Sequence, residues 1–118
     1  MAETLFRHGH PVMIDYTPAA GDIAAGDMVL IGNTTGLTLG VAHVDIANTV
    51  LGALAGGGGV YDCQVASNYA SGTLVYKPAA NAILTTTSTN NAPFGFTVES
   101  SAAANAVVKV LHHPYVPA

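Results

Sequence analysis

The sequence predicts a mainly β domain, a small barrel or sandwich. It contains a weak internal repeat, which we call the echo, has weak helix signals, and carries glycines at equivalent places in the two copies. Residues 25–42 are loosely repeated by residues 71–97. In each copy a small residue and a glycine precede an apolar run that contains valine, and a second glycine lies inside another apolar run. Glycine suits tight corners and bulges, whereas β-branched residues fill the strands between them. The echo therefore predicts one β-unit used twice.

Helix signals are weak along the whole chain. The best window, residues 64–71, is short and stops at Gly72, so it allows about one or two turns at most. The alanine-rich stretch at 100–105 lies between strand signals and predicts a loop or turn. A mainly β architecture follows.

Strands are expected where apolar and β-branched residues cluster between turn residues. In order, they lie near residues 12–16, 27–32, 37–46, 48–55, 59–65, 73–77, 82–87, 93–99 and 105–112. Residues 18–27 form the corner before the first copy of the echo, residues 33–36 a hairpin turn, and residues 88–93 a polar loop. The four glycines at 56–59 predict a flexible or tightly bent connection, because the Lys-Ser/Thr pair and the helix of a phosphate-binding loop do not follow them.

With 118 residues the chain fits one domain, long enough to bury a real core but too short for a second catalytic module. It divides into an extended N-terminal arm at 1–11, a β-barrel-like body at 12–111 and a proline-rich C-terminal tail at 112–118. The arm has no period and ends at Pro11, which favours an extended segment that is disordered or docks through Leu5 and Phe6 on a neighbouring subunit. The tail cannot continue a central strand.

The chain is poor in charge. Hydrophobic residues make up 50% of it, but charged residues make up only 8%, where a soluble domain usually has about 25%. A lone monomer relies on surface charge to stay soluble, so this deficit indicates a surface that partners cover. A secreted or simply polar, uncharged β-protein is the competing interpretation.

The formal net charge is -4, and the three basic residues do not cluster. Direct nucleic-acid binding is therefore not expected, because phosphate recognition needs concentrated positive charge. Glycines interrupt the longest apolar stretch, residues 50–60, so no membrane span is expected. Residues 1–8 lack the basic and then apolar plan of a signal peptide, so we expect synthesis and function without export.

The search for chemistry finds little. Cys63 is the single cysteine, which excludes an internal disulfide, and its alternation with Tyr61 and Val65 predicts a core residue rather than a nucleophile. His43 and Asp45 share a possible strand face and could orient a base, but no nucleophile setting accompanies them, and an ordinary polar face is favoured.

The remaining histidines do not form a metal site on their own. His8 and His10 share a face if the arm is extended, but no third ligand follows at metal-binding spacing. His112 and His113 would point to opposite sides of a strand. We therefore expect no metal, no cofactor and no catalytic residue.

A succession of short motifs spans most of residues 12–111. In order they are Ala25-Gly26-Asp27-Met28-Val29-Leu30, Leu39-Gly40-Val41-Ala42, Ser71-Gly72-Thr73-Leu74-Val75-Tyr76, Phe94-Gly95-Phe96 and Val107-Val108-Lys109-Val110. Their order and spacing resemble the small capsid cement or decoration proteins of tailed bacteriophages. The glycine run at 56–59 and the His/Pro-rich tail depart from that pattern, which leaves their placement open.

The resemblance implies a β-barrel or β-tulip-like body without catalysis. It also implies a structural virion protein, made in the host cytoplasm, that sits as a homotrimer on the outer surface of an icosahedral capsid and clamps adjacent capsomers. The major capsid protein is then the partner. We expect the capsid contacts to come from the terminal segments, through Leu5, Phe6, Arg7, His8, His10 and Tyr115.

Two other function classes stay open at the level of sequence. A carbohydrate-binding β-domain would use tyrosines as stacking groups, namely Tyr16, Tyr61, Tyr69, Tyr76 and Tyr115, although the absence of tryptophan weakens this interpretation. A small barrel hydrolase or lyase is the third class, and it lacks a convincing acid-base set.

Overall fold

The computed structural model describes residues 3–31, 38–78, 81–88 and 91–114 of the 118-residue chain. These residues form nine strands and no helix, which confirms the mainly β prediction. The strands are β1 (Thr4–Gly9), β2 (Met13–Tyr16), β3 (Met28–Ile31), β4 (Thr38–Ala42), β5 (Gly52–Ala55), β6 (Gly59–Gln64), β7 (Leu74–Lys77), β8 (Ala92–Thr97) and β9 (Val107–His112). Over the same ranges, no helix is long and apolar enough to cross a membrane.

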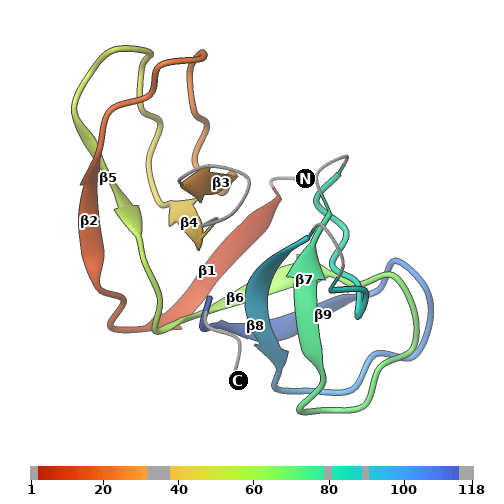
Figure 1. Cartoon of the computed structure of the whole chain (residues 1–118). Helices are drawn as coiled ribbons and strands as arrows, with labels where there is room; N and C mark the ends of the chain where they lie inside the picture. The colour runs from red at the N-terminus through yellow and green to blue at the C-terminus, as the bar shows by residue number, and fades with distance from the viewer. Residues whose placement is uncertain (1–2, 32–37, 79–80, 89–90, 115–118) are drawn as a thin grey trace.

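The strands form two antiparallel sheets that are not closed into a barrel. One has five strands in the order β1-β6-β9-β8-β7, and the other has four in the order β2-β5-β4-β3 (Figure 1). Of the two predicted architectures, the sandwich-like one is therefore correct. The larger hydrophobic core lies between the sheets, where Leu39 and Val41 of β4 meet Tyr61 of β6 and Phe94 of β8. A smaller cluster in unit 1 consists of Ala42, Ile46 and Leu54.

The two sheets repeat one topology. In β2-β5-β4-β3 and in β6-β9-β8-β7, the first strand along the chain pairs with the fourth, the fourth with the third, and the third with the second. We call strands β2–β5 unit 1 and strands β6–β9 unit 2. The prediction of one β-unit used twice is confirmed, and the first and last strands of each unit, β2 and β5 or β6 and β9, extend it beyond the residues that carry the echo.

The echoed glycines occupy equivalent places in the two units. Gly26 and Gly72 both have positive φ, 93° and 87°, and each donates its N–H over 2.6 Å to the last residue of the third strand of its unit, Ala42 of β4 and Thr97 of β8. Positive φ is the conformation that glycine adopts without a steric penalty.

The second glycine of each copy also has the same partner. Val29 lies opposite Gly40 in unit 1, and Val75 lies opposite Gly95 in unit 2. The sequence echo therefore corresponds to a shared hydrogen-bond register between the second and third strands of each unit.

The glycine run at 56–59 is a tight bend that joins the two sheets, which confirms the bent form of the predicted connection. β1 and β2 follow one another, as do β5 and β6, so a two-stranded ribbon passes from one sheet to the other (Figure 1). Gly57 and Gly58 have φ of 141° and 99°. A Cβ on Gly9, on the facing strand, would lie 2.7 Å from the Gly58 carbonyl oxygen. A side chain at Gly9 would therefore hold the segment at 56–59 away from the end of β1.

Two sequence expectations are wrong, and a third concerns residues that the structure does not describe. Residues 82–87 are not a strand, because only isolated bridges form there, from Leu84 to Val65 and from Thr85 to Tyr76. The expected strand at 48–55 begins only at Gly52, after a turn in which Val50 N–H donates to Ala47. The hairpin turn predicted at 33–36 falls outside the described residues.

Candidate functional surface

The N-terminal segment predicted as an arm is extended, and its residues 4–9 are hydrogen-bonded as strand β1 to β6 of the same chain. Its first residues also hold the corner of unit 1. The buried Thr4 donates both its backbone N–H (3.0 Å) and its hydroxyl (2.9 Å) to the Gly26 carbonyl oxygen. Glu3 accepts the Met28 N–H at 2.6 Å. The boundaries at 11/12 and 111/112 stay predictions.

The side chains that follow Thr4 on β1 are exposed. Leu5, Phe6, Arg7 and His8 all lie at the surface, as does His10 beyond the end of the strand. The sixth residue predicted to contact the capsid, Tyr115, lies outside the described residues. The structure thus brings the N-terminal candidates together along one sheet edge, where β1 has a neighbour on one side only.

Phe6 borders a cleft between β1 and unit 1. The cleft has a volume of about 370 Å³ and is lined by Thr4, Leu5, Phe6, Ala25, Gly26, Ala42, His43 and Tyr61. The Phe6 ring lies 4.6 Å from the His43 ring and 5.4 Å from the Tyr61 ring, measured between centroids. Mostly apolar walls make this cleft suited to an apolar side chain rather than to a charged ligand.

The His43–Asp45 pair that the sequence suggested as a possible oriented base does not form. The His43 ring is hydrogen-bonded through Nε2 to the Tyr61 hydroxyl at 2.6 Å, whereas Asp45 accepts the Ala25 N–H at 2.8 Å. Burial lowers the pKa of His43 and raises the pKa of Tyr61. His43 therefore belongs to an aromatic cluster that joins β1, β4 and β6, and Asp45 fixes a turn.

Cys63 is a core residue, as predicted. Its side chain is fully buried, and its thiol contacts the Tyr61 carbonyl oxygen at 3.8 Å. Burial, with a smaller contribution from Asp62, raises the pKa of the Cys63 thiol. A thiol held in its protonated form is a poor nucleophile.

His112 has a role that the sequence reasoning missed. It was assigned to the tail, but it is the last residue of β9, is fully buried, and donates from Nε2 to the Leu39 carbonyl oxygen of the other sheet at 2.8 Å. Its Nδ1 is buried without a hydrogen-bond partner. Burial lowers the pKa of His112 to about 4, with smaller contributions in the same direction from His113 and His43 and an opposing one from the Leu39 hydrogen bond. The alternation of apolar residues at Val108 and Val110, continued to position 112, is the sequence pattern that could have predicted that His112 points into the core.

Metal ligands do not gather in the described part of the chain. No group of three or more His, Cys, Asp or Glu side chains there could hold an ion. The carboxylates of Asp22, Asp27 and Asp45 instead accept backbone N–H groups in the turns of unit 1.

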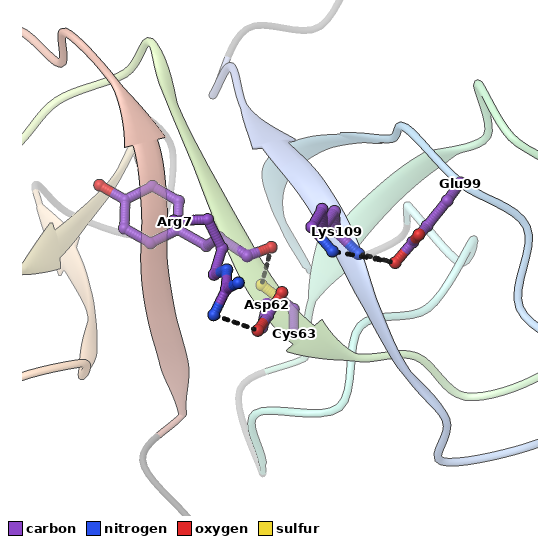
Figure 2. A network of polar contacts seen from close by, with 6 residues as sticks. Arg7, Asp62, Cys63, Glu99 and Lys109 are labelled. Carbon is purple, nitrogen blue, oxygen red and sulfur yellow. Dashed lines mark hydrogen bonds and ion pairs between the residues drawn. The ribbon is translucent and has the colours of Figure 1, made fainter.

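Two ion pairs lie on the outward side of the five-stranded sheet (Figure 2). Arg7 of β1 pairs with Asp62 of β6 at 3.7 Å, and Lys109 of β9 pairs with Glu99 at 4.0 Å. Both pairs are partly exposed, so each contributes between about 0 and 1 kcal/mol to stability. Their larger effect is on charge, because they neutralise this side of the sheet.

The family comparison agrees with the order of the motifs. The sequence matches the phage cement protein family over residues 6–112, which is most of the chain. The chain belongs to that family. The cement-protein match covers β1 from Phe6 onward and every later strand, so it includes both units and the bend between them. Comparison with curated proteins and with solved structures found no match. A structural role at the phage capsid follows from the family.

Proposed function

We propose that this cement protein binds the outer surface of an icosahedral phage head as a homotrimer and clamps neighbouring capsomers. The family match carries the proposal at the level of the capsid. Genome packaging pressurises a thin shell, and a clamp resists this pressure by adding buried contact across the seams between capsomers. A stable interface buries roughly 1,600 Å² in total, and many symmetry-related copies multiply a modest affinity.

The exposed face and edge of β1 are the proposed contact with the major capsid protein. Leu5 and Phe6 are apolar and exposed, and Arg7, His8 and His10 add polar groups beside them. A charge-poor surface lowers the cost of removing water from such a contact. Because Thr4 and Glu3 tie the start of β1 to unit 1 and β1 pairs with β6, the proposed contact strand is held as part of the body.

Point substitutions test this contact more sharply than deletion of residues 1–11, because deletion would also remove the Thr4 and Glu3 hydrogen bonds. Leu5→Asp places a charge in the proposed contact, and Val50→Asp is a matched control, since both side chains are 53% exposed. We expect Leu5→Asp to weaken binding to shells that lack the protein by at least about tenfold, which corresponds to about 1.4 kcal/mol, with unchanged melting.

Shell occupancy would be measured by sedimentation of shells with bound protein, together with the temperature at which loaded shells break. Equal occupancy of Leu5→Asp and wild type on heated or expanded shells would contradict the β1 contact. Loss of binding by Val50→Asp alone would move the contact to unit 1. The absence of catalysis is part of the same proposal, and the carbohydrate-binding alternative predicts a signal on a glycan array.

A further inference from the structure

The five-stranded sheet turns an apolar row outward. Val60, Leu111, Phe96 and Leu74 lie opposite one another on β6, β9, β8 and β7. The residues that alternate with them, such as Tyr61 and Val110, point into the core and are fully buried. We call the outward side the outer face and define it by its exposed and half-buried apolar residues, which are Leu74, Phe96, Val98, Val107 and Leu111. Val60 stands in the same row but is only 9% exposed.

Beside the polar Asp62, Gln64 and Lys109, the outer face carries apolar side chains at positions where a sheet with one side in water normally carries polar ones. Leu74, Val98 and Val107 are each more than two-fifths exposed. A row of apolar side chains that spans four strands is the kind of patch that a partner covers. The remaining question is which partner fits it.

The distribution of charge favours a second copy of this chain. Residues 12–55 hold four aspartates and no lysine or arginine, so the whole net charge of -4 lies in unit 1 and its loops. The rest of the chain holds three acidic and three basic residues. On the outer face, Arg7 is paired with Asp62 and Lys109 with Glu99. Two copies can meet here without like-charge repulsion, whereas contact through unit 1 would bring acidic surfaces together.

The size of the face is also suitable. The four strands that carry the outer face, at a spacing of about 4.8 Å and with up to six residues that each rise about 3.4 Å, give a patch of about 19 by 20 Å. Its projected area of roughly 380 Å², increased by side-chain relief, is within about twofold of the 800 Å² or so that each partner buries in a stable complex.

We propose that the outer face is the surface through which copies of this protein associate. This inference rests on the oligomer in the proposed function and names its surface. The β1 side of this face, at Leu5 and Arg7, adjoins the proposed capsid contact. The apolar side chains of the copies meet, and Asp62 and Lys109, which lie opposite each other between Leu111 and Val107, enter the contact already paired with Arg7 and Glu99. Unit 1, with its four aspartates, points away from it.

A matched pair of substitutions tests the proposal. Val107→Glu places a charge on the outer face, and Met13→Glu places one on unit 1, at side chains that are 46% and 47% exposed. We expect Val107→Glu to weaken self-association at least about tenfold, measured by light scattering and native mass spectrometry over a concentration series, while Met13→Glu keeps the wild-type mass. Melting curves would verify that both variants fold. A Val107→Glu variant with wild-type mass, or a wild type that is monomeric at every concentration, would overturn the proposal.

A second variant separates repulsion between copies from local damage. Lys109→Glu gives the outer face a net negative charge, so we expect weaker association at low salt that recovers near 1 M salt, where the Debye length is about 3 Å. Association that stays wild-type at low salt, or a loss that salt does not restore, counts against the proposal. A folded monomer that still binds shells would refute the outer face but not the capsid role, and a normal oligomer that ignores shells would do the reverse.

Discussion

Unit 1 and unit 2 share one strand topology but bury their side chains differently. In unit 2, β9 alternates between buried residues, such as Val110, and more exposed ones, and β6 does so from Tyr61 onward. In unit 1, β2 is exposed along most of its length, and Met13 and Ile14 face water. The same topology therefore does not require the same core. The glycines and turns at equivalent corners are what the two units have in common.

The units also differ in charge and in the loops beside them. Asp22, Asp27 and Asp45 fix the corners of unit 1 by accepting backbone N–H groups. At the equivalent corner of unit 2, neutral hydroxyls serve this purpose: Ser100 accepts the Ser71 N–H, and Ser101 accepts the Tyr69 N–H. One turn geometry is thus stabilised by two chemistries, and only one of them gives its unit a net charge.

The largest expected effect is a difference in the stability lost when alanine replaces the second glycine of each unit, Gly40 or Gly95. Gly95 has φ of 154°, and a Cβ there would overlap the Leu111 carbonyl oxygen, which is backbone and cannot move aside. At Gly40 a Cβ would lie 3.1 Å from side-chain carbons of Ile31 and Leu54, which can shift. We expect Gly95→Ala to cost about 3 kcal/mol or more and Gly40→Ala about 1 kcal/mol, measured by urea unfolding. Equal costs at the two positions would contradict this difference.

The next effect concerns the histidine that joins the two sheets. An unfolded His112 takes up a proton near its ordinary pKa of 6.5, but the folded protein resists protonation until about pH 4. Between these values the unfolded state binds more protons, so stability is complete above pH 6.5 and is lost as the pH falls. The loss reaches about 3 kcal/mol, to which the lowered pKa of His43 adds in the same direction.

His112→Gln removes the titrating group, so the variant should be less stable at pH 7 but should show a flatter loss between pH 6.5 and 4. His8→Gln is the control, because His8 is exposed on β1. Denaturant unfolding across this pH range makes the comparison. If the free energy of unfolding of His112→Gln falls with pH as steeply as that of wild type, protonation of another group causes the loss.

The smallest expected change in stability concerns the turns that precede β5 and β9. Thr49 and Asn105 occupy equivalent places with positive φ, 68° and 62°. A β-branched residue is strained in this conformation, whereas asparagine tolerates it. Thr49→Gly should therefore stabilise the protein by about 0.5 kcal/mol, while Asn105→Gly should change its stability by less than this. Thermal melting is sufficient to compare them, and a destabilised Thr49→Gly variant would show that the Thr49 side chain contributes to the turn.

Much of the fold could be predicted from the sequence because its corners are local. The glycines of the echo require particular backbone angles, and these angles placed the strands of both units in the right order. β1 was harder to predict, because its residues show no alternation and its strand conformation depends on pairing with β6 far along the chain. Residues 82–87 were wrongly predicted to be a strand, because their one fully buried side chain, Leu84, enters the core from an isolated bridge.

The candidate surface was predictable only in part. Leu5 and Phe6 of β1 lie at the surface, and their contact with the capsid stays a prediction. The outer face is recognisable only when β6, β7, β8 and β9 are aligned in register. His112 was missed because His113 and Pro114 follow it and make it look like part of a tail. Its burial depends on the approach of β4 from the other sheet, which no local pattern shows.

Electron microscopy of assembled heads that carry this protein tests the central claim most directly. We predict density for the protein as trimers on the outside of the shell, at threefold and quasi-threefold positions, with β1 against the capsomers and the outer faces of unit 2 together. Heads with no such density, or with the protein confined to the inside of the shell, would contradict it.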